Sequence, residues 1–132
     1  MLSLNVVFTL NTIVGLLFSL ALLIIPEQFM SLYGAPISPA TVYVARLFGA
    51  LMLGYINILW FARNSSESEA RRAIVTGSSV GWFIGFIWAL QGQISGVLNN
   101  LGWINVIIYF LFTLGYGYLE YVKKDGVIKR PS

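Results

Sequence analysis

The sequence predicts an all-α integral membrane protein, a bundle of four transmembrane helices in antiparallel up-down order. Charged residues make up only 10% of the 132 residues, against about 25% in an average soluble protein. Four apolar stretches are each long enough to cross a bilayer core about 30 Å thick. We place the spans at residues 4–25, 41–62, 73–94 and 104–121, within a single transmembrane domain covering residues 1–132.

The first predicted span, Leu4–Ile25, contains no charged residue and is followed directly by Pro26. Proline lacks a backbone N–H and clashes with the preceding turn, so the helix is expected to end there. The apolar run is longer than that of a signal peptide, and no small-residue cleavage site follows it, which favours a retained helix. Pro26–Tyr33 mixes aromatic and polar residues, which predicts a short interfacial helix between the first and second spans.

The remaining spans are bounded by polar or helix-capping residues. Ser38 before Pro39 suits the start of the second span, as an N-cap followed by a proline in the first turn. The segment Asn64–Arg72 is the clearly hydrophilic connector and separates the second span from the third. Cationic residues at 123 and 124 suit the negative end of the last helix. We expect residues 123–132 to form a cytoplasmic tail.

The distribution of basic residues predicts the orientation. With four spans, both termini and the connector between the second and third spans lie on one side of the membrane. Seven of the eight Lys and Arg residues fall on that side. The positive-inside rule therefore places both termini in the cytoplasm, and we expect a bacterial inner (plasma) membrane. The seven residues are Arg63, Arg71, Arg72, Lys123, Lys124, Lys129 and Arg130.

Composition excludes several classes of chemistry. The chain has no cysteine and no histidine, so thiol nucleophiles, cysteine-held metals and the usual ligands of haem and copper are missing. We therefore predict no cofactor and no metal site. Catalysis needs positioned titratable groups, and few are available, so we predict that the protein is not an enzyme. The basic residues lie at membrane edges, which argues against a nucleic-acid partner.

Arg46 is the one charged residue inside the first three predicted spans, and Glu120 lies at the inner edge of the fourth. Its position is about 7 Å below the start of the second span, so it can extend to the lipid headgroups or pair with Glu27, the one acid on that side. The functional alternative is that Arg46 anchors an anionic ligand or a lipid headgroup.

Glycines at four-residue spacing mark one face of the third span. Small residues at this spacing allow helix backbones to approach closely in lipid, so we predict a packing seam against a neighbouring helix or a second protomer. The alternative is a groove floored by glycine, with Trp88 as one wall, for a lipophile such as a quinone, a carotenoid or a lipid. The glycines assigned to helix packing are Gly77, Gly81, Gly85 and Gly92, with Gly15 and Gly49 on the first two spans.

Asn11, Asn57 and Asn105 are candidate interhelical residues within the predicted spans. Amides buried in a membrane bundle usually form hydrogen bonds between helices. None of these residues is charged, and no acid lies in the middle of a span, so proton-coupled transport lacks its usual residue.

The stretch Leu32–Arg63 carries a Gly-Ala-Pro turn, then Ala-Arg-Leu-x-Gly-Ala around Arg46 and Gly49, and ends in Trp-Phe-Ala-Arg. It resembles the corresponding part of small bacterial four-helix membrane proteins, the DoxX-like and related uncharacterised families. The resemblance implies the four-helix fold. Some DoxX relatives look like subunits of quinone-linked oxidoreductases, although this chain lacks the cysteine and histidine that redox chemistry would use.

The sequence favours a non-catalytic role as an accessory or assembly subunit that packs by its helix faces in a larger membrane complex. Short connectors and the glycine seam suit that role. The alternative is a homo-oligomeric binder or transporter of a lipophilic small molecule. The expected partners are therefore membrane lipids, other membrane subunits or further copies of the chain, and a lipophilic ligand.

Overall fold

The computed structural model describes residues 3–123 and contains five helices, with no strand among these residues. Four of the helices are long and apolar enough to cross a membrane, which confirms the predicted fold class. The predicted tail lies outside the described residues from position 124 onward. The elements are α1 (Leu4–Ile24), α2 (Pro26–Leu32), α3 (Pro39–Ala62), α4 (Glu69–Ile94), α5 (Gly102–Gly117) and a π-helical segment, η1 (Tyr118–Lys123).

The helix ends follow the capping residues. The Ser38 hydroxyl accepts a hydrogen bond from the Thr41 N–H at 3.1 Å, and α3 begins at Pro39. The start of α4 lies four residues before the predicted span because the Ser68 hydroxyl caps it by accepting from the Arg71 N–H. The first turn of α4 is therefore polar, and apolar content alone places its beginning too late.

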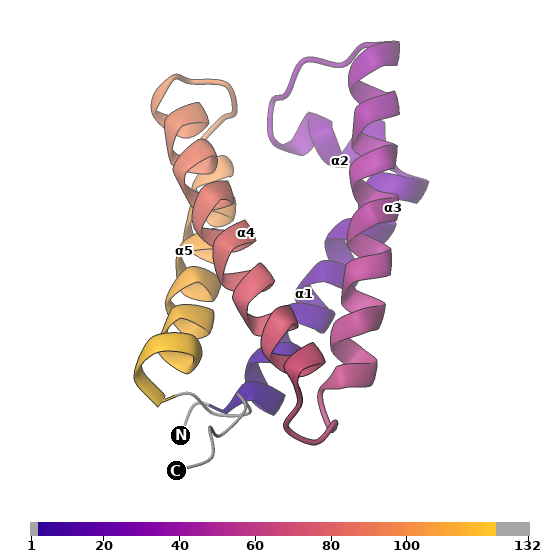
Figure 1. Ribbon diagram of the computed structural model, residues 1–132. Coiled ribbons are helices and arrows are strands. Elements are labelled where there is room, and N and C mark those ends of the chain that lie inside the picture. The colour runs from indigo at the N-terminus through magenta and orange to yellow at the C-terminus, as the bar shows by residue number, and fades with distance from the viewer. Residues whose placement is uncertain (1–2, 124–132) are drawn as a thin grey trace.

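The spanning helices form two antiparallel pairs. Helix α1 packs along α3, and α4 packs along α5, whereas the two pairs make few contacts with each other. Figure 1 shows the pairs converging at the end that holds the N-terminus, which we call the terminal end. They diverge toward the opposite end, which we call the α2 end. The spanning helices of the two pairs thus pack together at one end only.

Glycine allows close approach within each pair. A Cβ atom on Gly15 of α1 would overlap the Ile56 side chain of α3, and one on Gly49 would lie 3.1 Å from the Ser19 carbonyl oxygen. In the other pair, a Cβ atom on Gly85 of α4 would overlap the Tyr109 ring of α5. These three glycines therefore lie at tight helix–helix contacts.

The terminal end holds the hydrophobic core and several charged side chains. The core side chains are almost fully buried and come from all four spanning helices and η1: Leu4, Val7, Phe8, Leu59, Val75, Tyr116 and Leu119. Beside them, the Thr76 hydroxyl donates to the Glu120 carboxylate at 3.0 Å and ties α4 to η1. The Arg63 guanidinium lies over the Trp60 ring, 3.5 Å from its centroid.

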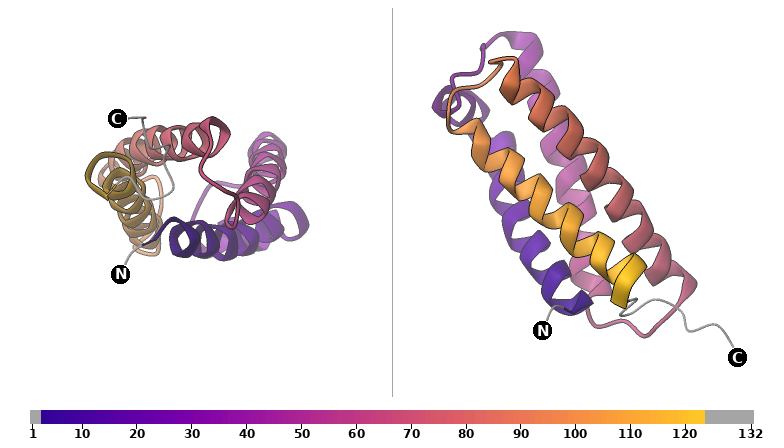
Figure 2. Two further views of the ribbon diagram at one scale, coloured as in Figure 1. Left: turned by 60° about the horizontal axis from the view of Figure 1, so that its bottom comes forward. Right: turned by 90° about the vertical axis from the view of Figure 1, so that its left-hand side faces the viewer.

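Hydrogen bonds join the two pairs along one side of the α2 end. The backbone N–H of Asn99, in the α4–α5 loop, donates to the Tyr33 carbonyl oxygen at 2.8 Å. The Asn99 side-chain amide donates to the Leu32 carbonyl oxygen at 2.8 Å. The right-hand view of Figure 2 shows the α2 region and the α4–α5 loop meeting at this end. The α2 end is therefore bridged by loops although its helices diverge.

Candidate functional site

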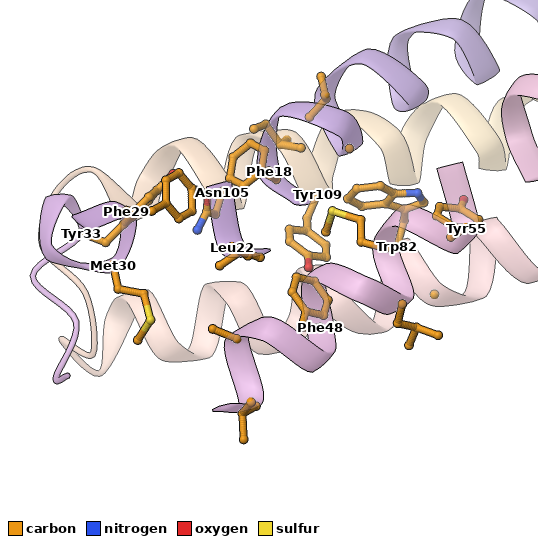
Figure 3. A pocket seen from close by; sticks show the side chains of 18 of the residues that line it. Phe18, Leu22, Phe29, Met30, Tyr33, Phe48, Tyr55, Trp82, Asn105 and Tyr109 are labelled. Atoms are coloured by element: carbon orange, nitrogen blue, oxygen red, sulfur yellow. Dashed lines mark hydrogen bonds between the residues drawn. The ribbon is translucent and has the colours of Figure 1, made fainter. Parts of the chain in front are cut away.

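A cavity of about 770 Å³ lies between the two helix pairs. Its volume falls within the usual range of small-molecule sites, roughly 300–1,000 Å³. The wall formed by α1 and α3 is almost entirely apolar (Figure 3), and its side chains lie one helical turn apart along each helix. The apolar side chains of this wall include Val14, Phe18, Leu22, Val44, Phe48, Leu51 and Met52.

The opposite wall comes from α4 and α5 and combines small and aromatic residues. Gly77 and Gly81 leave the α4 side of the cavity open, because no atom lies within 4 Å of a Cβ placed at either position. Trp82 and Tyr109 stand beside them in an edge-to-face contact, with ring centroids 4.8 Å apart. In Figure 3, Tyr109 extends from α5 toward Phe48 of α3. Aromatic rings therefore narrow the middle of the cavity.

A hydrogen-bonded cluster forms the floor of the cavity and joins all four spanning helices. The Asn11 amide of α1 donates to the Tyr116 hydroxyl of α5 at 2.7 Å and to the Tyr55 hydroxyl of α3 at 3.2 Å. The Tyr55 hydroxyl also bonds the Ser78 hydroxyl of α4 at 2.6 Å. The polar cluster lies where the pairs converge and holds them together there.

The α2 helix and its C-cap close the opposite end. Phe29, Met30 and Tyr33 line the cavity at that end, and the Tyr33 hydroxyl donates to the Asn105 side-chain oxygen of α5 at 3.0 Å. Burial raises the pKa of the Tyr33 phenol above its usual value of 10.0, so the hydroxyl stays protonated and able to donate. From the level of Asn11 to that of Leu22 the cavity extends about 17 Å along α1.

The cavity opens between α3 and α4. These two helices pack little against each other, and lining side chains on α3 stay exposed, Val44 by 61% and Leu51 by 75%. The left-hand view of Figure 2 shows α1, α3, α4 and α5 arranged in a ring, so this opening faces sideways. It lies on the apolar part of both helices, at the height that a bilayer would cover.

Electrostatically the cavity is neutral, because none of its lining residues is charged. The residues described by the structure also contain no group of three or more Asp, Glu, His or Cys side chains able to hold a metal ion. The chemistry available inside is therefore hydrogen bonding by phenol, indole, amide and hydroxyl groups, together with apolar packing.

The three side chains predicted to bind a ligand lie outside the cavity. Arg46 and Glu27 are exposed, and neither side chain has an ion-pair partner within residues 3–123, so the pair considered in the sequence is absent here. Trp88 is 67% exposed and does not line the cavity. It lies about 10 Å further along α4 than Gly81, beyond the part of the helix that lines the cavity, and Trp82 provides the aromatic wall instead.

The glycine strip of α4 divides into two parts. Only Gly85 of this strip makes a tight contact with another helix, whereas Gly77 and Gly81 line the cavity and form no packing seam within the described part of the chain. A Cβ atom on Gly92 would lie 4.0 Å from the side chain of Val97, which follows the end of α4. No atom of another helix lies within 4 Å of that Cβ position. Because the pairs diverge, one continuous face of α4 meets a helix at one point and open space at another.

Two of the three asparagines considered in the sequence behave as expected. Asn11 bonds to two other helices and Asn105 accepts from Tyr33. The expectation is wrong for Asn57, which is exposed and donates to the Leu53 carbonyl oxygen of its own helix at 2.8 Å. The spacing of Asn105 and Tyr109, one helical turn apart, could have identified that wall of the cavity, but the sequence contains no comparable signal for Trp82.

Comparison with known proteins identifies the family of the chain. No curated protein and no solved structure matches the chain at a significant level. The model of a family described as a domain of unknown function (DUF8292) matches residues 2–119. Since this range includes nearly all of the four helices that could span a membrane, the chain belongs to that family.

Proposed function

We propose that the protein binds a lipophilic small molecule in the cavity between its two helix pairs, within the membrane. The observation that carries this proposal is an uncharged, largely apolar cavity of about 770 Å³ that opens sideways between α3 and α4. A lipophile dissolved in the bilayer could reach such a site without crossing water. One chain encloses this volume, so self-association is not required to build the site.

Recognition at this site must come from packing and hydrogen bonding. A molecule that moves from lipid into the cavity leaves one apolar environment for another, so the hydrophobic effect contributes little. Shape is provided by the rings of Phe18, Phe48, Trp82 and Tyr109, which line the cavity from all four spanning helices. Preference for one lipophile over the surrounding lipid then depends on its fit between these rings.

We also infer the orientation from charge. Arg63, Arg71 and Arg72 lie near the terminal end, where α3 ends and α4 begins, and the positive-inside rule assigns that end to the cytoplasm. The cavity would then lie toward the outer leaflet of a bacterial inner membrane. A relation of Leu32–Arg63 to DoxX-like proteins stays a proposal, because the family that matches residues 2–119 is described only as a domain of unknown function.

The accessory-subunit role favoured by the sequence is the competing proposal. Many large apolar side chains face outward, among them Leu17, Phe61 and Trp88, and either lipid or a partner subunit would cover them. The glycine seam that supported the role is reduced to Gly85, since Gly77 and Gly81 face the cavity. A non-catalytic protein is common to both proposals and stays a prediction.

The test is purification from native membranes in a mild detergent, followed by identification of the bound lipids and proteins by mass spectrometry. Gly81→Leu fills the cavity without meeting any atom within 4 Å of its Cβ position. Gly54→Leu is the matched control, because Gly54 is also helical, exposed and free of atoms within 4 Å, but lies outside the cavity.

We expect the wild type and Gly54→Leu to retain the same lipophile and Gly81→Leu to lose most of it. Equal retention by all three proteins would contradict the proposal. The accessory role would be favoured instead if a protein partner co-purified in stoichiometric amount and no bound lipophile was lost in Gly81→Leu.

A further inference from the structure

We propose that the ligand is an uncharged lipophile carrying a carbonyl oxygen, a ketone, an ester or a quinone, held by hydrogen-bond donors on the α4–α5 wall. This inference rests on the proposed function and names the chemical class of the ligand. Its basis is the difference between the polar groups of the cavity that have partners and those that do not.

The hydroxyl groups at both ends of the cavity are already paired. At the floor, Tyr55 bonds Ser78 and accepts from Asn11. At the α2 end, the Tyr33 hydroxyl donates to the Asn105 side-chain oxygen. These groups hold the helices together and leave little hydrogen-bonding capacity for a ligand.

Three donors along the α4–α5 wall have no partner within residues 3–123. They are the indole N–H of Trp82, the hydroxyl of Tyr109 and the side-chain NH₂ of Asn105. None of these atoms is among the fully buried polar atoms that lack a partner, so each remains accessible. All three residues line the same cavity and lie close along one wall (Figure 3).

The donors belong to neighbouring side chains but point to different parts of the cavity. The rings of Trp82 and Tyr109 touch, with centroids 4.8 Å apart. In Figure 3, however, the indole nitrogen points toward Tyr55 and the Tyr109 oxygen toward Phe48. Asn105 precedes Tyr109 by four residues, which places both on the same face of α5, about 6 Å apart along the helix axis. The α1–α3 wall opposite offers apolar side chains. The cavity thus has one wall that donates hydrogen bonds and one that packs against hydrocarbon.

The chemistry of the donors selects the ligand. An indole N–H and an amide NH₂ can only donate, so their partner must be an acceptor oxygen. No cation lines the cavity, and moving a carboxylate or phosphate into it would leave a buried charge without compensation. A neutral carbonyl meets both conditions, and its hydrocarbon substituents would occupy the apolar wall.

The test uses two probes that differ only at the carbonyl: dioctyl ketone and heptadecane, which have the same number of carbon atoms. The protein is placed in lipid nanodiscs with an equimolar mixture of both, recovered by affinity capture, and its bound probes are quantified by gas chromatography–mass spectrometry. Nanodiscs that carry Gly81→Leu give the background of probe dissolved in lipid.

Tyr109→Phe and Trp82→Phe each remove one donor and keep an aromatic ring in place. Tyr43→Phe is the matched control, because Tyr43 is 64% exposed on α3 and lies outside the cavity. Thermal unfolding of each variant verifies that it is folded. We expect the wild type and Tyr43→Phe to prefer the ketone by about two- to tenfold per hydrogen bond, and this preference to fall in the two cavity variants.

The outcomes separate the two proposals. Retention of both probes above background without a preference for the ketone would overturn the carbonyl inference and leave the proposed function standing. A preference that is unchanged in both Tyr109→Phe and Trp82→Phe would overturn the carbonyl inference in the same way. Retention of neither probe above background would overturn the carbonyl inference. The proposed function would then be decided by the purification experiment, which shows whether a native lipophile is bound in the cavity.

Discussion

Replacement of Asn11 by Leu should destabilise the protein by about 2 kcal/mol. Asn11 is only 1% exposed, and its amide donates to the hydroxyls of Tyr116 at 2.7 Å and Tyr55 at 3.2 Å. In membrane proteins a hydrogen bond of this kind contributes about 0.6 kcal/mol on average and about 1.7 at most. Two such bonds would therefore be lost.

The larger part of the effect comes from the partner that is left behind. Tyr116 is fully buried, and the Asn11 amide donates to its hydroxyl at 2.7 Å; the side chains of Tyr55 and Ser78 also interact with this hydroxyl. Loss of a donor to a buried hydroxyl costs about 1–3 kcal/mol when no other group replaces it, and Tyr55 and Ser78 lower this cost for Tyr116. Tyr55 is less affected because it keeps its 2.6 Å bond to Ser78.

The assay is reversible unfolding in mixed detergent micelles, with the free energy of unfolding measured for a double-mutant cycle. Tyr116→Phe removes the hydroxyl that Asn11→Leu would deprive of its amide donor, so the double variant should be more stable than the sum of the single losses predicts, by about 1 kcal/mol. Asn57→Leu is the control, since Asn57 is exposed and bonds only within its own helix, and it should change little. Strict additivity, or a loss for Asn11→Leu no larger than for Asn57→Leu, would refute the reasoning.

Three further predictions follow from the packing and the loops. Gly85→Ala should lower the free energy of unfolding by about 1–3 kcal/mol, because its methyl group would overlap the facing tyrosine ring; Gly54→Ala, with no atom within 4 Å, should not, and equal effects in chemical denaturation would contradict the close contact. Arg46→Met and Glu27→Gln should have additive effects on stability, because no ion pair joins these side chains; a coupling above about 0.5 kcal/mol in a double-mutant cycle would show that they interact. Tyr33→Phe should speed amide hydrogen exchange in α2 by loosening its bond to α5, and unchanged exchange would mean that the backbone bonds to the α4–α5 loop suffice.

The hydrophobic segments and most of their boundaries, with the start of α4 as an exception, were predictable from local signals. A run of apolar residues long enough to cross a bilayer has few other stable structures, so four runs predict four spanning helices. Pro26 and Ser38 mark helix ends through the backbone hydrogen bonds that they remove or replace, and α2 lies between them as expected. The hydrogen bonds of Asn11 and Asn105 to other elements also followed, because an amide in a spanning helix needs a partner.

Only the tertiary structure decided which face of each helix meets another helix, the cavity or the outside. In a soluble protein, hydrophobicity distinguishes the buried face, but in a membrane helix the face toward lipid is as apolar as the face toward protein. The pattern of α4 therefore could not separate Gly85, which contacts α5, from Gly81, which faces open space, or Trp82 in the cavity from Trp88 outside it. That distinction depends on the angle at which the two helix pairs diverge, and the angle is set by contacts between residues far apart in the chain.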